Sequence, residues 1–126
     1  MEHSHTILMA VFDGDWKICE KSIEQYNYKT WKQVMAVNLD AGFLLTKHLI
    51  PLLRESKSSS VIFTSSGVGK VGRPYWGSYS VSKFATEGLM QILSEELQNT
   101  SSIRVNCINP GAVRTKMRRS ADPAET

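Results

Sequence analysis

VIFTSSGVG, at residues 61–69, is a run of β-branched and aromatic residues that ends in two serines and a glycine-containing loop. The segment YSVSK, at residues 79–83, follows this loop and begins a predicted helix. Residues four apart stand on the same face of a helix, with their Cβ atoms roughly 5–6 Å apart. The pattern therefore holds the Tyr79 phenol beside the Lys83 ammonium, facing the Ser66 hydroxyl at a strand end. Together these three groups predict an acid/base site.

Two longer motifs surround these residues, GSYSVSKFA at residues 77–85 and VNCINPG at residues 105–111. Together with Ser66, and with Asn38 in the helix before the strand, they resemble the short-chain dehydrogenase/reductase family, in particular its uncharacterised bacterial oxidoreductases. The resemblance covers roughly residues 22–119, leaving residues 1–21 unmatched and residues 120–126 as a polar tail. We therefore expect residues 1–126 to form a single partial domain.

The resemblance implies an oxidoreductase that uses NAD or NADP and transfers a hydride between nicotinamide and a small alcohol or carbonyl substrate. It implies four catalytic residues, namely Asn38, Ser66, Tyr79 and Lys83. It also implies cofactor contacts from five residues, namely Tyr79, Lys83, Pro110, Gly111 and Thr115.

The chemistry of this site depends on how easily the tyrosine exchanges a proton. Free tyrosine titrates near pH 10. A lysine charge about 4 Å away is worth up to roughly 4 kcal/mol at an effective dielectric constant of 20, which predicts that Lys83 lowers the pKa of Tyr79 by up to about 3 units. Ser66 would donate a hydrogen bond to the substrate oxygen as charge develops. In the alternative interpretation, Tyr79 and Lys83 are an ordinary surface pair and Ser66 is a turn residue.

By resemblance, Lys83 also holds the nicotinamide ribose. Asn38 would open its helix and hold a water that connects the lysine with solvent. The alternative for Asn38, which lies within an apolar stripe, is an amide that caps a local bend.

The order of elements predicts an α/β fold. We expect strands at Thr6–Phe12, Val61–Thr64 and Ile103–Ile108, and helices at Tyr28–Leu53 and Ser78–Leu97. One apolar stripe is expected along the first helix, comprising Trp31, Met35, Asn38, Gly42, Leu45, Leu49 and Leu52. The unbroken apolar character of the middle strand indicates a sheet covered on both faces. With the resemblance, this predicts a partial doubly wound, Rossmann-like parallel sheet that lacks the N-terminal strands.

Composition narrows the classes of protein further. Of the 126 residues, 41% are hydrophobic and 21% are charged, which is typical of a globular domain. The formal net charge of +3 is carried by scattered cations and does not indicate nucleic-acid binding. No apolar stretch reaches the roughly 18 residues of a membrane helix, so we expect a cytoplasmic protein without a membrane partner. Cys19 and Cys107 fit neither a disulfide framework nor a metal spacing, and no metal is expected.

The cofactor-binding half of the family pattern is missing. No G-x-x-x-G-x-G turn occurs in the sequence, although such a turn receives the pyrophosphate of a dinucleotide at a helix N-terminus. We therefore expect a truncated form that is inactive alone and does not bind NAD or NADP by itself. The competing hypothesis is a non-catalytic dimerisation or association module derived from the same family.

Association is expected under both hypotheses. By resemblance, the helices that carry Asn38 and Tyr79 pair with their copies in a homo-oligomer. Both helices are apolar on more faces than one short sheet can cover. Leaving six such side chains in water would forgo about 9–18 kcal/mol, as much as the whole stability of a domain, about 5–15 kcal/mol. These six are Leu44, Leu49, Leu52, Phe84, Leu89 and Ile92.

Overall fold

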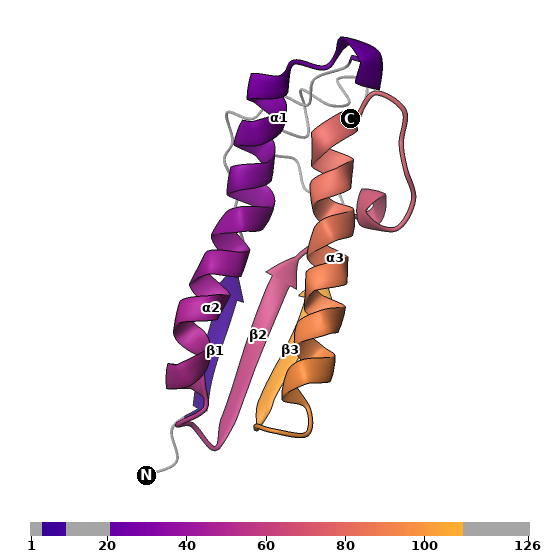
Figure 1. The fold of residues 1–126 in the computed structure, drawn as a ribbon. Coiled ribbons are helices and arrows are strands. Elements are labelled where there is room, and N and C mark those ends of the chain that lie inside the picture. Colours follow the sequence, from indigo (N-terminus) through magenta and orange to yellow (C-terminus); the bar gives the residue numbers. More distant parts are fainter. Residues whose placement is uncertain (1–3, 10–20, 110–126) are drawn as a thin grey trace, which may run out of the picture.

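The computed structural model of the chain describes residues 4–9, as backbone, and residues 21–109. Three parallel strands form its sheet in the order β1-β2-β3, with β1 at Ser4–Met9, β2 at Ser58–Thr64 and β3 at Ile103–Ile108 (Figure 1). The predicted parallel arrangement is confirmed, and β3 has the predicted bounds. The middle strand begins at Ser58, earlier than predicted, and the part of the predicted first strand beyond Met9 lies outside the described residues.

Two long helical runs lie side by side on the same face of this sheet (Figure 1). The first consists of α1 at Tyr28–Met35, a π-turn at Ala36–Asp40 and α2 at Ala41–Leu53. The second is α3 at Gly77–Leu97, and short 3-10 turns occupy Ile23–Gln25 and Gly67–Gly69. Both predicted helices are confirmed. No helix among the described residues combines the length and apolar character needed to cross a bilayer.

The expectation of a sheet covered on both faces is wrong for the described residues. Along β2, Val61 and Phe63 are buried whereas Ile62 between them is only half-buried. Along β3, Ile103 and Val105 are buried whereas Arg104 is exposed. This alternation arises because successive strand residues point to opposite faces, and α2 and α3 both pack on one of them.

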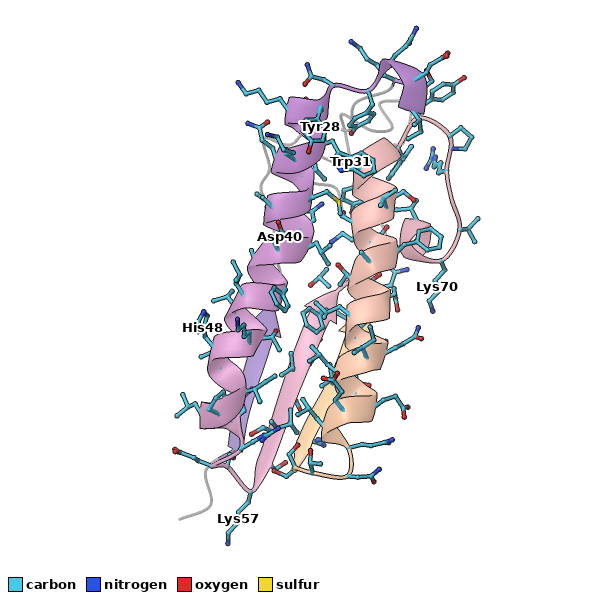
Figure 2. All side chains as sticks on the ribbon, viewed as in Figure 1. Tyr28, Trp31, Asp40, His48, Lys57 and Lys70 are labelled. Carbon is cyan, nitrogen blue, oxygen red and sulfur yellow. The ribbon has the colours of Figure 1, made fainter. Side chains whose placement is uncertain are left out.

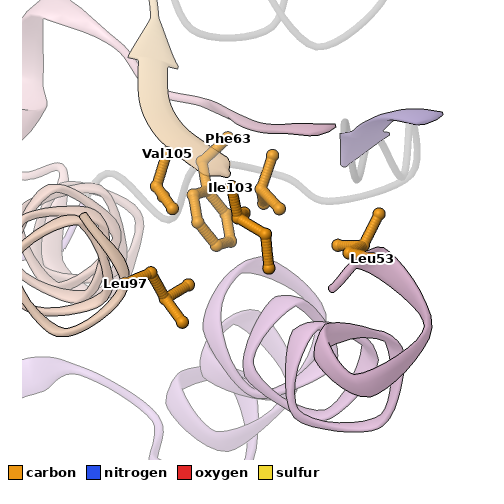
Figure 3. Packing of buried hydrophobic residues seen from close by; sticks show 6 residues of the cluster. Leu53, Phe63, Leu97, Ile103 and Val105 are labelled. Carbon is orange, nitrogen blue, oxygen red and sulfur yellow. The ribbon is translucent and has the colours of Figure 1, made fainter. Parts of the chain in front are cut away.

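A hydrophobic core fills the space between the sheet and the two helices (Figure 3). Its buried side chains come from β2, β3 and the C-terminal ends of α2 and α3, and are Leu53, Val61, Phe63, Leu97, Ile103 and Val105. Leu49 and Leu89 pack against this core, so the expectation that they lack a partner is wrong. Leu44, Leu52, Phe84 and Ile92 are 44–58% exposed, as the sequence predicted.

The π-turn changes which side of the first helical run faces the core. A regular helix has 3.6 residues per turn, and counting in such steps from the buried Val34 brings Leu45 and Leu52 inward. A π-turn takes up an extra residue, so Thr46 and Leu53 face inward instead, at 2% exposure each, and Leu45 and Leu52 are about half exposed. The predicted stripe is therefore wrong at these two positions.

Two neighbouring leucines provide a test of which helix face is turned towards the core. Leu53→Ala removes a side chain enclosed by the core and should cost about 2–5 kcal/mol of unfolding free energy. Leu52→Ala makes the same chemical change on a side chain that is 55% exposed, so its cost should stay within about 0.5 kcal/mol. Urea denaturation followed by circular dichroism, at one dilute protein concentration, measures both. The reverse ranking would contradict the observed helix orientation.

Candidate active site

The strands all point towards the end of the molecule at which α3 begins (Figure 1). At the end of β2, the Ser65 backbone N–H donates to the Ile108 carbonyl at 2.7 Å, which holds the exit of β2 against the end of β3. The next turn packs so closely that a Cβ at Gly69 would lie 2.8 Å from Ser65 Oγ and 3.1 Å from the Lys83 carbonyl. Only glycine fits there, and Ser66 is consequently placed beside α3.

The start of α3 is held by contacts with this turn and with its own first residues. Ser80 Oγ donates to the Val68 carbonyl at 2.8 Å. The ring of Trp76, immediately before the helix, meets the Tyr79 ring edge to face with 5.8 Å between their centroids. The Ser66 side chain also acts on the Tyr79 phenol and lowers its pKa. The phenol and hydroxyl predicted from the sequence therefore meet in the structure.

Lys83 is 5% exposed, and its ammonium reaches the sheet. Its Nζ donates to the Thr64 carbonyl at 3.1 Å and lies 5.5 Å from the centroid of the Tyr79 ring. A side chain so enclosed is not part of an ordinary surface pair, so that alternative is wrong for Lys83. The lysine instead joins the second turn of α3 to the last residue of β2.

Burial dominates the electrostatics of this pair. It raises the pKa of Tyr79, and the hydrogen bond with Ser66 acts in the opposite direction. Burial also lowers the pKa of Lys83, opposed by the neighbouring Cys107. The prediction that the lysine charge lowers the pKa of Tyr79 is therefore wrong in this structure, because withdrawing the phenol from water disfavours its charged form.

Cys107 lies on β3 close to the lysine. The thiol is half-buried and packs against the core. Burial, with a further contribution from Glu87, raises its pKa to about 11. The thiol is therefore protonated at neutral pH and is not poised as a nucleophile.

Asn38 lies in the π-turn, and its contacts reach Ser82 and Thr86 on α3. Its side-chain Nδ2 donates to Ser82 Oγ at 3.1 Å, and Ser82 Oγ donates in turn to the Tyr79 carbonyl at 2.7 Å. Thr86 Oγ1 lies 3.4 Å from the Asn38 carbonyl. The amide therefore reaches across to α3 rather than capping a bend of its own helix, and the helix is opened at this residue as the resemblance implied.

Ser66, Tyr79 and Lys83 thus meet at one end of the sheet, with Asn38 linked to them through Ser82. The predicted cofactor contacts Pro110, Gly111 and Thr115 lie outside the described residues. Sequence reasoning missed the role of Ser82 and Thr86, although both are buried polar residues on the face of α3 that meets the first helical run. The two residues are four positions apart and therefore share a helix face. Buried small polar side chains need hydrogen-bond partners, so this spacing could have predicted a polar contact with another element.

Comparison with known proteins places this geometry in a family. A family model described as short chain dehydrogenase matches residues 17–126. The uncharacterised oxidoreductase YciK of Escherichia coli strain K12 is 53% identical over 108 residues, which cover 86% of this chain and 41% of that protein.

Solved structures agree with the sequence match. A short chain dehydrogenase from Pseudomonas syringae superposes with a TM-score of 0.87 at 47% identity, over 97% of this chain and 48% of that one. A short chain dehydrogenase from Escherichia coli CFT073, complexed with NADPH, gives a TM-score of 0.83 at 48% identity, over 96% of this chain and 48% of that one.

The chain therefore spans about half the length of the relatives it matches. Its three parallel strands and their helices are part of the Rossmann-like α/β fold of those proteins. The family match over most of the sequence and the arrangement of Ser66, Tyr79 and Lys83 lead to one conclusion: the chain belongs to the short-chain dehydrogenase family.

Proposed function

We propose that this chain supplies the acid/base part of the active site of an NAD(P)-dependent oxidoreductase that interconverts an alcohol and a carbonyl compound. The observation that carries the proposal is the buried Lys83 ammonium, which lies 5.5 Å from the centroid of the Tyr79 ring, with the Ser66 side chain close enough to lower the pKa of that phenol. Further support comes from a relative at 48% identity that is complexed with NADPH.

The proton is handled by Tyr79 and Ser66 in this proposal. Because burial raises the pKa of Tyr79, the phenol is protonated near neutral pH and can donate its proton to a carbonyl oxygen during reduction. The Ser66 hydroxyl, whose side chain lowers the pKa of the same phenol, donates to the same oxygen as negative charge develops. A nicotinamide, when bound, supplies or accepts the hydride.

The residues present fit a nicotinamide ribose. The Lys83 ammonium has three donors, of which the Thr64 carbonyl takes one. Ribose hydroxyls are acceptors of the kind that the remaining donors would bind. We expect Asn38, half-buried and linked to α3 through Ser82, to hold the water that connects this lysine with solvent.

A second candidate function is an association module, and a specific observation favours self-association. A groove of about 600 Å³ runs between α2 and α3. Its rim includes Phe43 and Ile92, which are 47% and 58% exposed, and Leu52 and Phe84 on the same helices are 55% and 44% exposed. Exposed apolar area of this kind marks an interaction surface. We propose that a second copy of the chain covers it, whether or not the chain is catalytic.

Light scattering after size exclusion at micromolar concentration tests this association. The chain should elute as a dimer or larger species, and Ile92→Glu should shift it towards the monomer because a charge would be buried in the interface. Ile23→Glu is the matched control, since Ile23 is 67% exposed but lies outside both helices. A monodisperse 14 kDa species with a cooperative melt would contradict the proposal.

Calorimetric titration with NADPH addresses cofactor binding. No G-x-x-x-G-x-G turn is present to receive the pyrophosphate, so the 126-residue chain should show no binding heat at sub-millimolar NADPH. A fusion to the cofactor-binding N-terminal half of a family member should bind it. Tight binding by the chain alone would overturn the assignment of the cofactor cradle to that other half.

Catalysis is tested in the same fusion with a panel of small aldehydes and ketones. Tyr79→Phe keeps the ring but removes the transferable proton, so turnover should fall about 10²-fold or more. Tyr28→Phe is the control, because Tyr28 is 70% exposed and its ring contacts the Lys32 ammonium. If Tyr79→Phe folds normally and keeps most of its activity, the assignment of the acid/base residue is wrong.

The pH dependence of the same reaction has a definite sign. Reduction uses the protonated phenol, so its rate should be constant at neutral pH and fall as pH rises through the raised pKa of Tyr79. Alcohol oxidation uses the ionised phenol and should rise over the same interval. Ser66→Ala removes the hydrogen bond that lowers this pKa, so both inflections should move to higher pH. A shift to lower pH would contradict the described geometry.

A further inference from the structure

Tyr26 connects the segment before α1 with the first turn of α3. Its hydroxyl lies 2.6 Å from Ser78 Oγ, although the two residues are 52 positions apart in the sequence. Ser78 is fully buried, so this hydroxyl pair replaces the hydrogen bonds to water that the serine lost on folding. Ser78 immediately precedes the proposed acid/base residue Tyr79.

The ring of Tyr26 is held in place by its neighbours as well as by its hydroxyl. Gly77 has a φ of +34°, and a Cβ at this position would lie only 2.3 Å from Tyr26 Cε2. The Tyr26 ring also meets the Trp31 ring edge to face, with 6.0 Å between their centroids. Figure 2 shows Tyr28 and Trp31 on the turns of α1 that stand level with the start of α3. Gly77 thus leaves room for a ring that Trp31 supports from the other helix.

The start of α3 needs such support because its own cap is weak. Trp76 stands at the N-cap position, and its side chain makes no capping hydrogen bond. Two backbone N–H groups, those of Tyr79 and Ser80, share the Trp76 carbonyl at 3.1 and 3.3 Å. A helix end without a side-chain cap opens more readily than its interior. A contact that fixes Ser78 therefore also limits the movement of the adjacent Tyr79.

We propose that Tyr26 is a positioning residue that, through its hydrogen bond to Ser78 and its contact with Gly77, fixes the first turn of α3 and with it the Tyr79 phenol. This inference rests on the proposed function only for the role of Tyr79. The contact itself exists independently of any catalytic activity. Its geometry can therefore be tested on the chain without a turnover assay.

Tyr26→Phe is the test variant and Tyr28→Phe is its matched control, because each removes one hydroxyl from a tyrosine in the same part of the chain. Tyr28 is 70% exposed, and its ring is covered by the Lys32 ammonium at 5.0 Å rather than by α3. Ser78→Ala removes the same hydrogen bond from its other partner. The double variant Tyr26→Phe/Ser78→Ala should behave like either single variant, because all three lack the same interaction.

Hydrogen exchange measured by mass spectrometry on the 126-residue chain is the first readout. Peptides covering residues 77–83 should exchange roughly two- to tenfold faster in Tyr26→Phe and in Ser78→Ala, in line with the loss of one hydrogen bond. Peptides from β2 and from the C-terminal half of α3 should be unchanged, and Tyr28→Phe should match the parent chain throughout. Unchanged exchange over residues 77–83 would overturn the proposal. Global loss of structure in both variants, in place of the local change, would overturn it as well.

The second readout separates positioning from general stabilisation. Nuclear magnetic resonance of tyrosines labelled with ¹³C at Cζ follows each phenol during a pH titration, with Tyr79→Phe identifying the signal of Tyr79. Burial is the larger influence on Tyr79, so in Tyr26→Phe its titration midpoint should move down towards the ordinary value near 10. A residue that only stabilised the fold would leave this midpoint unchanged, and that result would overturn the proposal. Failure of Tyr79→Phe to affect turnover in the fusion would overturn the proposed function instead.

Discussion

Lys83 carries an ammonium group into the space between α3 and the sheet, where it donates to the carbonyl of Thr64 at 3.1 Å. A buried charge is costly unless hydrogen bonds replace its hydration, so this contact restricts how α3 can lie against the end of β2. Gly69 packs against the Lys83 backbone, where α3 comes close to the turn after β2. Ser66, two residues after Thr64, and Tyr79, one helical turn before Lys83, then come close enough for the serine side chain to lower the pKa of the phenol.

Small polar side chains join the two helical runs near this site. Asn38 donates to Ser82, Ser82 donates to the Tyr79 carbonyl, and Thr86 approaches the Asn38 carbonyl. At the other end of the sheet, leucine, isoleucine, valine and phenylalanine side chains form the core. The polar end of the molecule is therefore specified by directional hydrogen bonds, which tolerate little displacement. The apolar end provides most of the stability, because burial of apolar area is not directional.

Desolvation makes the tyrosine and the lysine chemically distinct from their free forms. Burial raises the pKa of Tyr79 and lowers that of Lys83, so each group is pushed towards its neutral form. A phenol that keeps its proton is suited to donate it, and a lysine held by a backbone carbonyl is suited to orient a ligand. The Tyr26–Ser78 contact lies in the same first turn of α3 that carries Tyr79.

Apolar periodicity predicted the strand–helix–strand unit between Val61 and Ile108, and the motifs around Ser66, Tyr79 and Lys83 carried the resemblance that predicted the family and the proximity of these three residues. These features are local, because a helix brings residues four apart together and a parallel strand delivers its last residue to the same edge. The tertiary structure decided what depends on contacts between distant segments. The π-turn, anchored by Asn38 to Ser82 on another helix, exchanged Leu45 and Leu52 for Thr46 and Leu53 on the inner face. Burial by surrounding elements raised the pKa of Tyr79 where the lysine charge alone predicted a fall. The contact between Tyr26 and Ser78 has no local signature at all, since only the folded chain brings those residues together.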